Sequence, residues 1–191
     1  MRKIYLMDVG ARGGIKWPFT KVKNFDLSMV LVEPDPVEAA QLKKEFTSSN
    51  IETEVLPIAL WSSEEQIRLS LTRSPGASSV FSPNSNFLSQ FPDLARFEVM
   101  KEIEFSANTV DQLASNGDIG RVDFLKIDIQ GAELAVLSGG LDYFKSNLIG
   151  IEVEVEFSEL YVGQPLFADV DTFIRQKIHL ELWDISKSFW K

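Results

Sequence analysis

Short apolar segments of strand length alternate with helical segments along most of this chain, and no other feature restricts its fold as strongly. Such alternation predicts an α/β fold, in which a mostly parallel sheet has helices on both faces and right-handed crossovers. We find no internal repeat and no linker, so we expect residues 1–191 to form a single domain. The expected strands are 4–9, 29–33, 54–60, 66–72, 99–105, 122–129, 148–155 and 180–185, and the expected helices are 15–23, 36–46, 110–115, 132–145 and 168–177.

The alternation breaks between residues 66 and 105. Segments 66–72 and 99–105 alternate apolar and polar residues, which predicts a β-hairpin inserted into the α/β fold. The intervening residues 73–96 are rich in Ser, Pro, Asn and Phe, and a loop of this length is often a lid or a binding loop. Its larger apolar side chains are expected to be buried, which argues against disorder; they are Phe81, Phe87, Leu88, Phe91 and Leu94.

The composition excludes several classes of function. The chain has no cysteine, which rules out disulfides, cysteine metal clusters and thiol nucleophiles. Its net charge of −9 repels phosphate backbones, so we expect no nucleic-acid partner. No apolar run approaches the ~20 residues that cross a bilayer, and the apolar start is too short for a signal peptide. We therefore expect no membrane partner and a cytoplasmic location.

The first expected strand ends in an acid and a glycine-rich turn. Ligands of parallel α/β sheets bind beyond the carboxyl ends of the strands, which makes this turn a candidate site. Asp8 stands two residues before Gly10, and Gly13 and Gly14 follow. Glycines allow close backbone approach to a ligand, and the following helix N-terminus favours negative charge. These features suit the amino and carboxyl groups of S-adenosylmethionine (SAM), whereas the spacing does not fit the G-x-G-x-x-G dinucleotide fingerprint. A plain strand–helix junction is the alternative.

A second acid ends the second expected strand. Glu33 follows Asp8 by 25 residues, about one strand–helix–strand unit. A carboxylate there can accept hydrogen bonds from both hydroxyls of a ribose. Pro34 and Pro36 stiffen the turn, and Asp35 is expected to cap the next helix. The alternative for Glu33 is a solvated acid at a strand end.

The segment 122–133 carries the densest set of candidate residues. Lys126 lies inside an apolar strand, where it needs a carboxylate partner or a cofactor, unless it reaches the surface. Asp128, Gln130 and Glu133 follow and are expected to face the ligand crevice. The alternative for Glu133 is an acid that only stabilises the start of a helix.

Two further segments carry weaker signals. Ala59 and Leu60, with Trp61, end the third expected strand, where an apolar slot for adenine is expected; core packing explains them equally well. The single histidine, His179, has no histidine partner and is expected at the surface.

The region after residue 150 is rich in acids. Glu152, Glu154 and Glu156 alternate on one strand face, which we interpret as a face in contact with water. Tyr161 and Gln164 face a substrate or pack within a turn, and the sequence leaves both interpretations open.

Three segments together resemble the signature blocks of the FkbM family of SAM-dependent methyltransferases. They are Asp8-Val9-Gly10-Ala11, Glu33-Pro34-Asp35-Pro36 and Lys126-Ile127-Asp128-Ile129-Gln130-Gly131-Ala132-Glu133, and residues 152 and 160–165 also resemble that family. The resemblance implies a class I, Rossmann-like methyltransferase fold with SAM as cofactor and methyl donor. It also implies O-methylation of a hydroxyl on a small molecule, sugar or glycan.

The resemblance also assigns residues. Asp8, Gly10, Ala11 and Gly14 match the methionine end of the cofactor site, Glu33 and Pro34 match its ribose end, and Asp128 matches the acid beside the methyl group, next to Gln130. Two positions depart from the family. Gln130 stands where a Glu is usual, and Arg12 stands where a small or amide residue is common. We expect Arg12 to contact a substrate acid or Asp8.

For the chemistry, Asp128 is the first candidate for the base that accepts the hydroxyl proton, followed by Glu133 and Glu152. A divalent metal on Asp128 and Glu152 is an alternative that we do not expect. Residues 73–96 are expected to select the acceptor. Gln130 and the few residues before the first strand also allow a non-catalytic module that binds SAM or a partner. The glycine spacing disfavours a nucleotide-dependent oxidoreductase.

Overall fold

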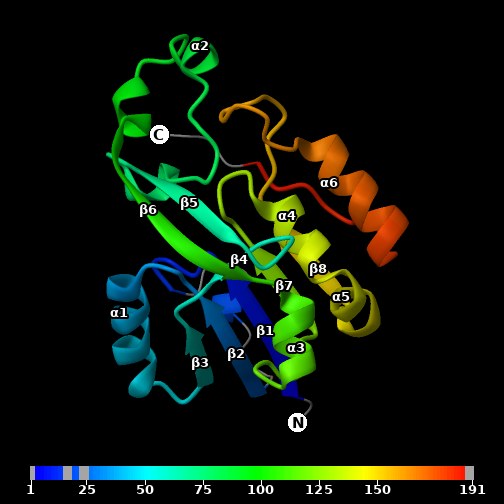
Figure 1. Ribbon diagram of the computed structural model, residues 1–191. Helices are drawn as coiled ribbons and strands as arrows, with labels where there is room; N and C mark the ends of the chain where they lie inside the picture. Colours follow the sequence, from blue (N-terminus) through cyan, green and yellow to red (C-terminus); the bar gives the residue numbers. More distant parts are fainter. Residues whose placement is uncertain (1–2, 15–18, 22–25, 188–191) are drawn as a thin grey trace.

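The centre of the molecule is a five-stranded, fully parallel sheet (Figure 1). The computed structural model describes residues 3–14, 19–21 and 26–187. The strands lie in the order β3 (Glu52–Leu56), β2 (Asp26–Val32), β1 (Lys3–Val9), β7 (Phe124–Ile127) and β8 (Gly150–Val153). The chain moves outward from β1 to β3 and then crosses to β7 on the other side. The order therefore reverses between β1 and β7, where ligands of open α/β sheets bind.

Helices cover both faces of this sheet, as the sequence predicts. On one face α1 (Pro36–Thr47) packs against alternate residues of β2 such as Met29 and Leu31. Val30 and Val32 point to the opposite face. That face is covered by α3 (Val110–Asn116), α4 (Glu133–Gly139), α5 (Leu141–Asn147) and α6 (Phe167–Phe173). Burial on both faces explains why the central strands are mostly apolar toward their carboxyl ends, as in the Met-Val-Leu-Val run that ends β2.

Local sequence signals determine where several helices begin and end. The Asp35 side chain accepts hydrogen bonds from the first turn of α1, as expected for a cap, and Thr109 caps α3 in the same way. The expected helix 132–145 is instead divided into α4 and α5. At Gly139 a Cβ atom would lie 2.0 Å from the carbonyl oxygen of Trp61, so only glycine allows this close approach.

The expected insertion forms a second sheet of three strands, in the order β4 (Ala59–Leu60), β6 (Val99–Asn108) and β5 (Gln66–Thr72). β5 and β6 pair antiparallel, which confirms the hairpin. The expected strand 54–60 is divided between the two sheets as β3 and β4. Pro57 lies at the division, and its missing N–H group cannot continue a ladder.

Residues 73–98 are more regular than a loop. They form two 3-10 turns, η2 (Pro75–Ala77) and η3 (Leu94–Phe97), and the short helix α2 (Ser85–Leu88). Leu88 is buried, and Phe81 and Phe87 pack against the same cluster. The expectation of burial is wrong for Phe91 and Leu94, which are 44% and 40% exposed because they lie beyond that cluster.

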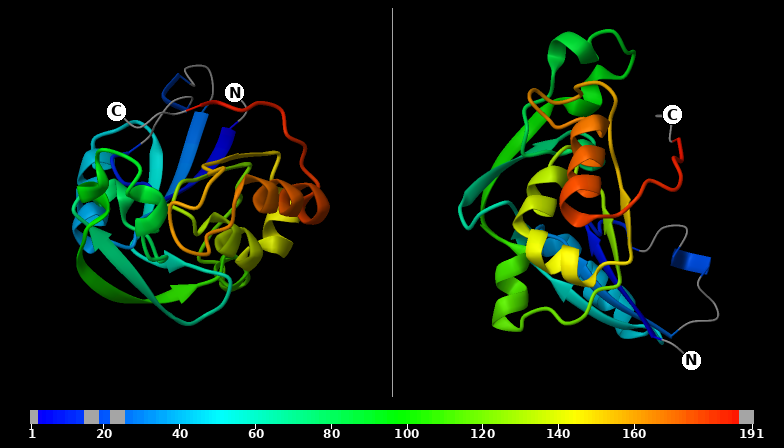
Figure 2. Two further views of the ribbon diagram at one scale, coloured as in Figure 1. Left: turned by 90° about the horizontal axis from the view of Figure 1, so that it is seen from above. Right: turned by 90° about the vertical axis from the view of Figure 1, so that its right-hand side faces the viewer.

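The remaining differences between the predicted and the observed structure lie near the two ends of the chain. The expected helix 15–23 lies mostly outside the described residues; within it, η1 (Phe19–Lys21) is a single 3-10 turn. The expected strand 180–185 is wrong, because residues 179–187 run outside both sheets (Figure 2) and Trp183 is 94% exposed. A π-helical turn, η4 (Ile174–Ile178), extends α6. His179 ends it with a φ of 68° and is exposed, as expected.

None of the helices in the described ranges has the length and apolar character needed to cross a membrane.

Candidate active site

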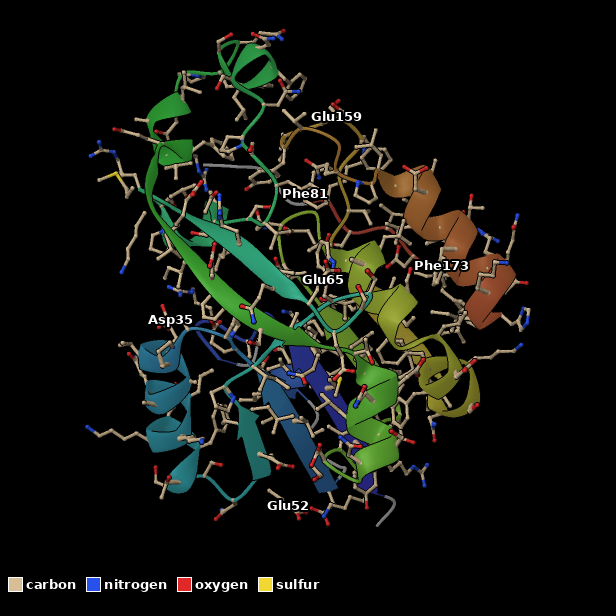
Figure 3. All side chains as sticks on the ribbon, viewed as in Figure 1. Asp35, Glu52, Glu65, Phe81, Glu159 and Phe173 are labelled. Atoms are coloured by element: carbon tan, nitrogen blue, oxygen red, sulfur yellow. The ribbon has the colours of Figure 1, made fainter. Side chains whose placement is uncertain are left out.

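A cavity of about 460 Å³ lies between the carboxyl ends of β1, β2 and β7 and the hairpin of β5 and β6. This volume is within the range of about 300–1,000 Å³ typical of small-molecule sites. Figure 3 shows both ends of the parallel sheet. Asp35, at the start of α1, lies at the end next to the hairpin, and Glu52, at the start of β3, lies at the opposite end. The cavity therefore lies at the point where the strand order reverses.

The predicted cofactor and catalytic residues divide into two groups. Those that line the cavity are Gly10, Glu33, Pro34, Ala59, Leu60, Asp128 and Gln130. Those outside its wall are Asp8, Ala11, Gly14, Glu133 and Glu152. The structure thus brings the tips of three neighbouring strands and the apolar segment 58–61 into one wall, while the ligand roles of these residues remain predictions.

The turn after β1 connects three parts of the site. The backbone N–H groups of Gly10 and Ala11 both donate to the carbonyl of Val32, at 3.1 and 3.2 Å. Gly10 has a φ of 81°, and a Cβ atom there would lie 2.1 Å from the carbonyl oxygen of Asp128. Only glycine allows the three strand ends to approach this closely.

Asp8 and Lys126 form a buried ion pair. Lys126 Nζ donates to Asp8 Oδ1 at 2.9 Å, and the two side chains are 5% and 1% exposed. The two residues are neighbours in the register of β1 and β7. The prediction that Lys126 needs a carboxylate partner is confirmed, and the alternative of a surface lysine is wrong. The pair lies beside the cavity rather than in its wall.

The tip of β2 presents a buried carboxylate to the cavity. Glu33 is 5% exposed, and its Oε1 accepts a hydrogen bond from the backbone N–H of Asp35 at 3.0 Å. Burial raises the pKa of the Glu33 carboxyl above its usual value. Arg12 also lines the cavity and donates to Asp35 at 3.0 Å and to Glu38 at 3.5 Å. The expected contact of Arg12 with Asp8 is therefore wrong.

Gln130 connects two carboxyl groups in the cavity wall. Its Nε2 donates to Glu154 Oε2 at 2.5 Å and to Asp128 Oδ1 at 3.3 Å. Burial, followed by a hydrogen bond to Asp128, raises the pKa of the Glu154 carboxyl to about 9. Near neutral pH this pair of carboxyl groups therefore shares one proton.

Sequence reasoning missed Glu154, because the alternating acids were interpreted as a face in contact with water. β8 ends at Val153, and the N–H group of Glu154 donates to the carbonyl of Ile127, which holds it against the end of β7. The available signal was its position directly after an apolar strand, which is also the position of Glu33 and Asp128. Glu152 is exposed on β8, and that part of the prediction is confirmed.

Glu133 does not face the cavity, so this part of the prediction is wrong. Its side chain is 3% exposed and accepts a hydrogen bond from the N–H of Ile129 at 2.8 Å. Burial raises the pKa of the Glu133 carboxyl to about 7. Glu133 lies in the first turn of α4, the place of the structural alternative, an acid at a helix start, and its hydrogen bond to Ile129 also closes the turn between β7 and α4.

Tyr161 and Gln164 pack within a turn and do not line the cavity. The Tyr161 hydroxyl donates to the carbonyl of Ala77 at 2.8 Å and lies 3.2 Å from Gln130 Oε1. Gln164 accepts from the N–H of Tyr161 at 2.7 Å. The two residues thus connect the turn that carries Gln130 to the insertion.

Within the described residues, no group of three or more His, Asp or Glu side chains is placed to hold a metal ion. Asp128 lines the cavity, whereas Glu152 does not.

The strand order, the cavity at the switch point and the acids that follow its strands define a Rossmann-like methyltransferase fold. The family model described as Methyltransferase FkbM domain matches residues 8–178, and the chain belongs to this family. No curated protein and no solved structure matches the chain. The family makes the protein a methyltransferase, which requires a methyl donor.

Proposed function

We propose that the protein uses SAM as its methyl donor and methylates a hydroxyl oxygen of a small molecule or saccharide. One observation carries the proposal: a single cavity at the switch point is lined by Glu33, by Ala59 and Leu60, and by Asp128. A methyl donor of this kind needs a hydrogen-bond acceptor for its ribose, an apolar slot for its purine and an anionic environment for its cationic centre.

The residues in the cavity wall fit these needs. The Glu33 carboxylate accepts hydrogen bonds from the ribose hydroxyls, and it is held in place by the N–H of Asp35. Ala59 and Leu60 are buried and supply the apolar walls for adenine. Gly10 allows the methionine end to approach the backbone closely. Asp8, already paired with Lys126, is assigned to the ammonium group through water.

Asp128 is assigned as the proton acceptor. When bound, SAM would supply an electrophilic methyl group on its sulfonium, and Asp128 would accept the proton that the acceptor hydroxyl loses on methylation. Because Glu154 and Asp128 share one proton near neutral pH, the pair carries one negative charge. Gln130 fixes the pair by donating to both groups, and an amide does this without adding a third charge.

Two measurements test this function: titration calorimetry with SAM, and transfer of a labelled methyl group to a panel of hydroxyl compounds. Glu33→Gln is expected to weaken SAM binding about tenfold or more, because an amide nitrogen faces hydroxyl donors poorly. Asp128→Asn is expected to weaken SAM binding less than Glu33→Gln does, because it removes one negative charge near the sulfonium, and to lower kcat about 10²- to 10⁴-fold.

The matched control is Glu159→Gln, an exposed acid outside the cavity wall, which should behave as wild type. A folded wild-type protein that does not bind SAM contradicts the proposal. SAM binding without transfer to any acceptor would instead identify a non-catalytic SAM-binding module.

A further inference from the structure

The roof of the cavity is a row of aliphatic side chains on β5. Ile67, Leu69 and Leu71 alternate along this strand and therefore share one face, and all three line the cavity. Phe105 of β6 stands opposite Ile67 in the antiparallel register and lines the cavity as well. We call these four residues the apolar roof.

The apolar roof is not part of the hydrophobic core. All four side chains are half-buried. Among the described residues, none of the three clusters of buried apolar side chains includes them. A ligand that covers apolar surface in a cavity removes that surface from water, and this makes binding more favourable.

The two sides of the cavity differ in polarity. The strand ends contribute Glu33, Asp128, Gln130 and Glu154, whereas the insertion contributes mainly apolar residues, with Ser78 and Arg96 as its hydrophilic side chains. A saccharide carries hydroxyls on every side, and those facing the apolar roof would lose water without gaining a partner. An apolar molecule with one hydroxyl matches both sides, because its body covers the roof and its hydroxyl reaches Asp128.

We propose that the methyl acceptor is a hydroxylated apolar compound whose body binds to Ile67, Leu69 and Leu71. This inference rests on the proposed function, because it assigns the acceptor half of the same cavity. It excludes the saccharides that the proposed function leaves open. It also extends acceptor selection from residues 73–96, several of which line the same cavity, to the adjoining strand β5.

A homologous series of alcohols tests this inference. Methyl transfer from SAM is measured for 1,4-butanediol, 1,6-hexanediol and 1,8-octanediol, with methyl α-D-glucopyranoside as the saccharide. Each methylene that becomes buried is expected to raise kcat/KM about fourfold. The octanediol should therefore exceed the butanediol by roughly 100-fold or more and should exceed the saccharide.

A pair of adjacent variants shows where the selectivity arises. Leu69→Asn places an amide in the apolar roof and is expected to reduce the gain per methylene to less than twofold, with SAM binding unchanged. Arg68→Gln is the matched control: Arg68 is the preceding residue, is exposed and pairs with Glu102 and Glu104 on β6. This variant should retain both the chain-length dependence and SAM binding.

Three outcomes overturn the inference. They are preference for the saccharide over the octanediol, an unchanged chain-length dependence in Leu69→Asn, and loss of SAM binding in a folded Leu69→Asn protein. The last would assign the roof to the cofactor. Failure of the proposed function has a different signature, since wild-type protein would then not bind SAM. Calorimetry of the diols without cofactor would still decide whether the roof binds apolar chains.

Discussion

Lys126 and Asp8 show how a single buried charge constrains this fold. Each side chain is at most 5% exposed, and each is neutralised by the other at 2.9 Å. Taking two charges out of water costs several kcal/mol per ion, and close pairing offsets that cost. The pair joins β1 to β7 at the switch point, next to the strand ends that carry the site, so the charge balance of the buried sheet depends on these two residues.

We predict that Lys126→Met destabilises the protein by about 3–5 kcal/mol, because it removes the ammonium group that pairs with the buried carboxylate of Asp8. Urea unfolding followed by circular dichroism measures the change. The double variant Asp8→Asn with Lys126→Met should recover part of the loss, since neither remaining group carries a charge. If the double variant is destabilised by the sum of the losses measured for Lys126→Met and Asp8→Asn alone, the two residues are not coupled and the prediction fails.

Single residues also show where sequence reasoning succeeds. A lysine inside an apolar strand needs a carboxylate partner or a cofactor unless it reaches the surface, so its pairing was among the outcomes that the sequence predicted. Asp35 as a helix cap was predictable for the same reason, because capping is a local interaction. Glu154 was missed because its environment depends on Gln130 and Asp128, which reach it only after β7 and β8 pair.

At the scale of elements, the turn after β1 illustrates a constraint that only glycine satisfies. Gly10 and Gly13 both have positive φ angles, 81° and 78°. A Cβ atom at Gly10 would lie 2.1 Å from the carbonyl oxygen of Asp128, whereas a Cβ atom at Gly13 has no neighbour within 4 Å among the described atoms. A side chain at Gly13 would therefore cause backbone strain alone, whereas a side chain at Gly10 would cause backbone strain and steric overlap.

We predict that Gly13→Ala costs about 1–2 kcal/mol from the left-handed conformation alone. Gly10→Ala should cost clearly more and should also weaken SAM binding, because the turn must move away from Asp128. Thermal unfolding and SAM titration of both variants measure these effects. Equal losses of stability in the two variants would show that the close approach at Gly10 does not constrain the fold.

Helices and strands that depend on the local sequence pattern were predicted well. Those that depend on pairing with residues distant in the sequence were not. The strand at 66–72 was predicted with its observed bounds, because its alternation is a local signal. The expected strand 54–60 divides because its second half pairs with β6, which is distant in sequence. The expected strand 180–185 has the composition of a strand, but it pairs with neither sheet: Leu180 packs against the core, whereas Leu182, Trp183 and Ile185 are exposed. The apolar roof escaped notice for a related reason, since periodicity alone does not distinguish a core face from a cavity face.

At the scale of the whole molecule, buried acids couple stability to pH. Burial raises the pKa of Glu133 to about 7, and burial with the hydrogen bond to Asp128 raises that of Glu154 to about 9. The same groups ionise near the ordinary glutamate pKa of 4.5 when they are exposed on unfolding. Between pH 4.5 and these raised values the folded state therefore binds more protons than the unfolded state. Stability must then fall as pH rises, which is opposite to the usual behaviour of paired carboxylates.

The two acids predict different windows for this loss. The contribution of Glu133 is fully present below pH 4.5 and is lost by about pH 7, whereas that of Glu154 continues to decline up to about pH 9. The net charge of −9 acts in the same direction, because further ionisation increases self-repulsion.

We therefore predict that the Tm of the wild-type protein falls between pH 6 and pH 9. In Glu154→Gln, which is permanently neutral, the fall above pH 7 should be smaller by on the order of 5 °C. Glu159→Gln, an exposed control, should follow the wild-type curve. Differential scanning calorimetry at pH 6, 7, 8 and 9 measures the effect, and parallel curves for wild type and Glu154→Gln would mean that Glu154 is already ionised in the folded protein at neutral pH.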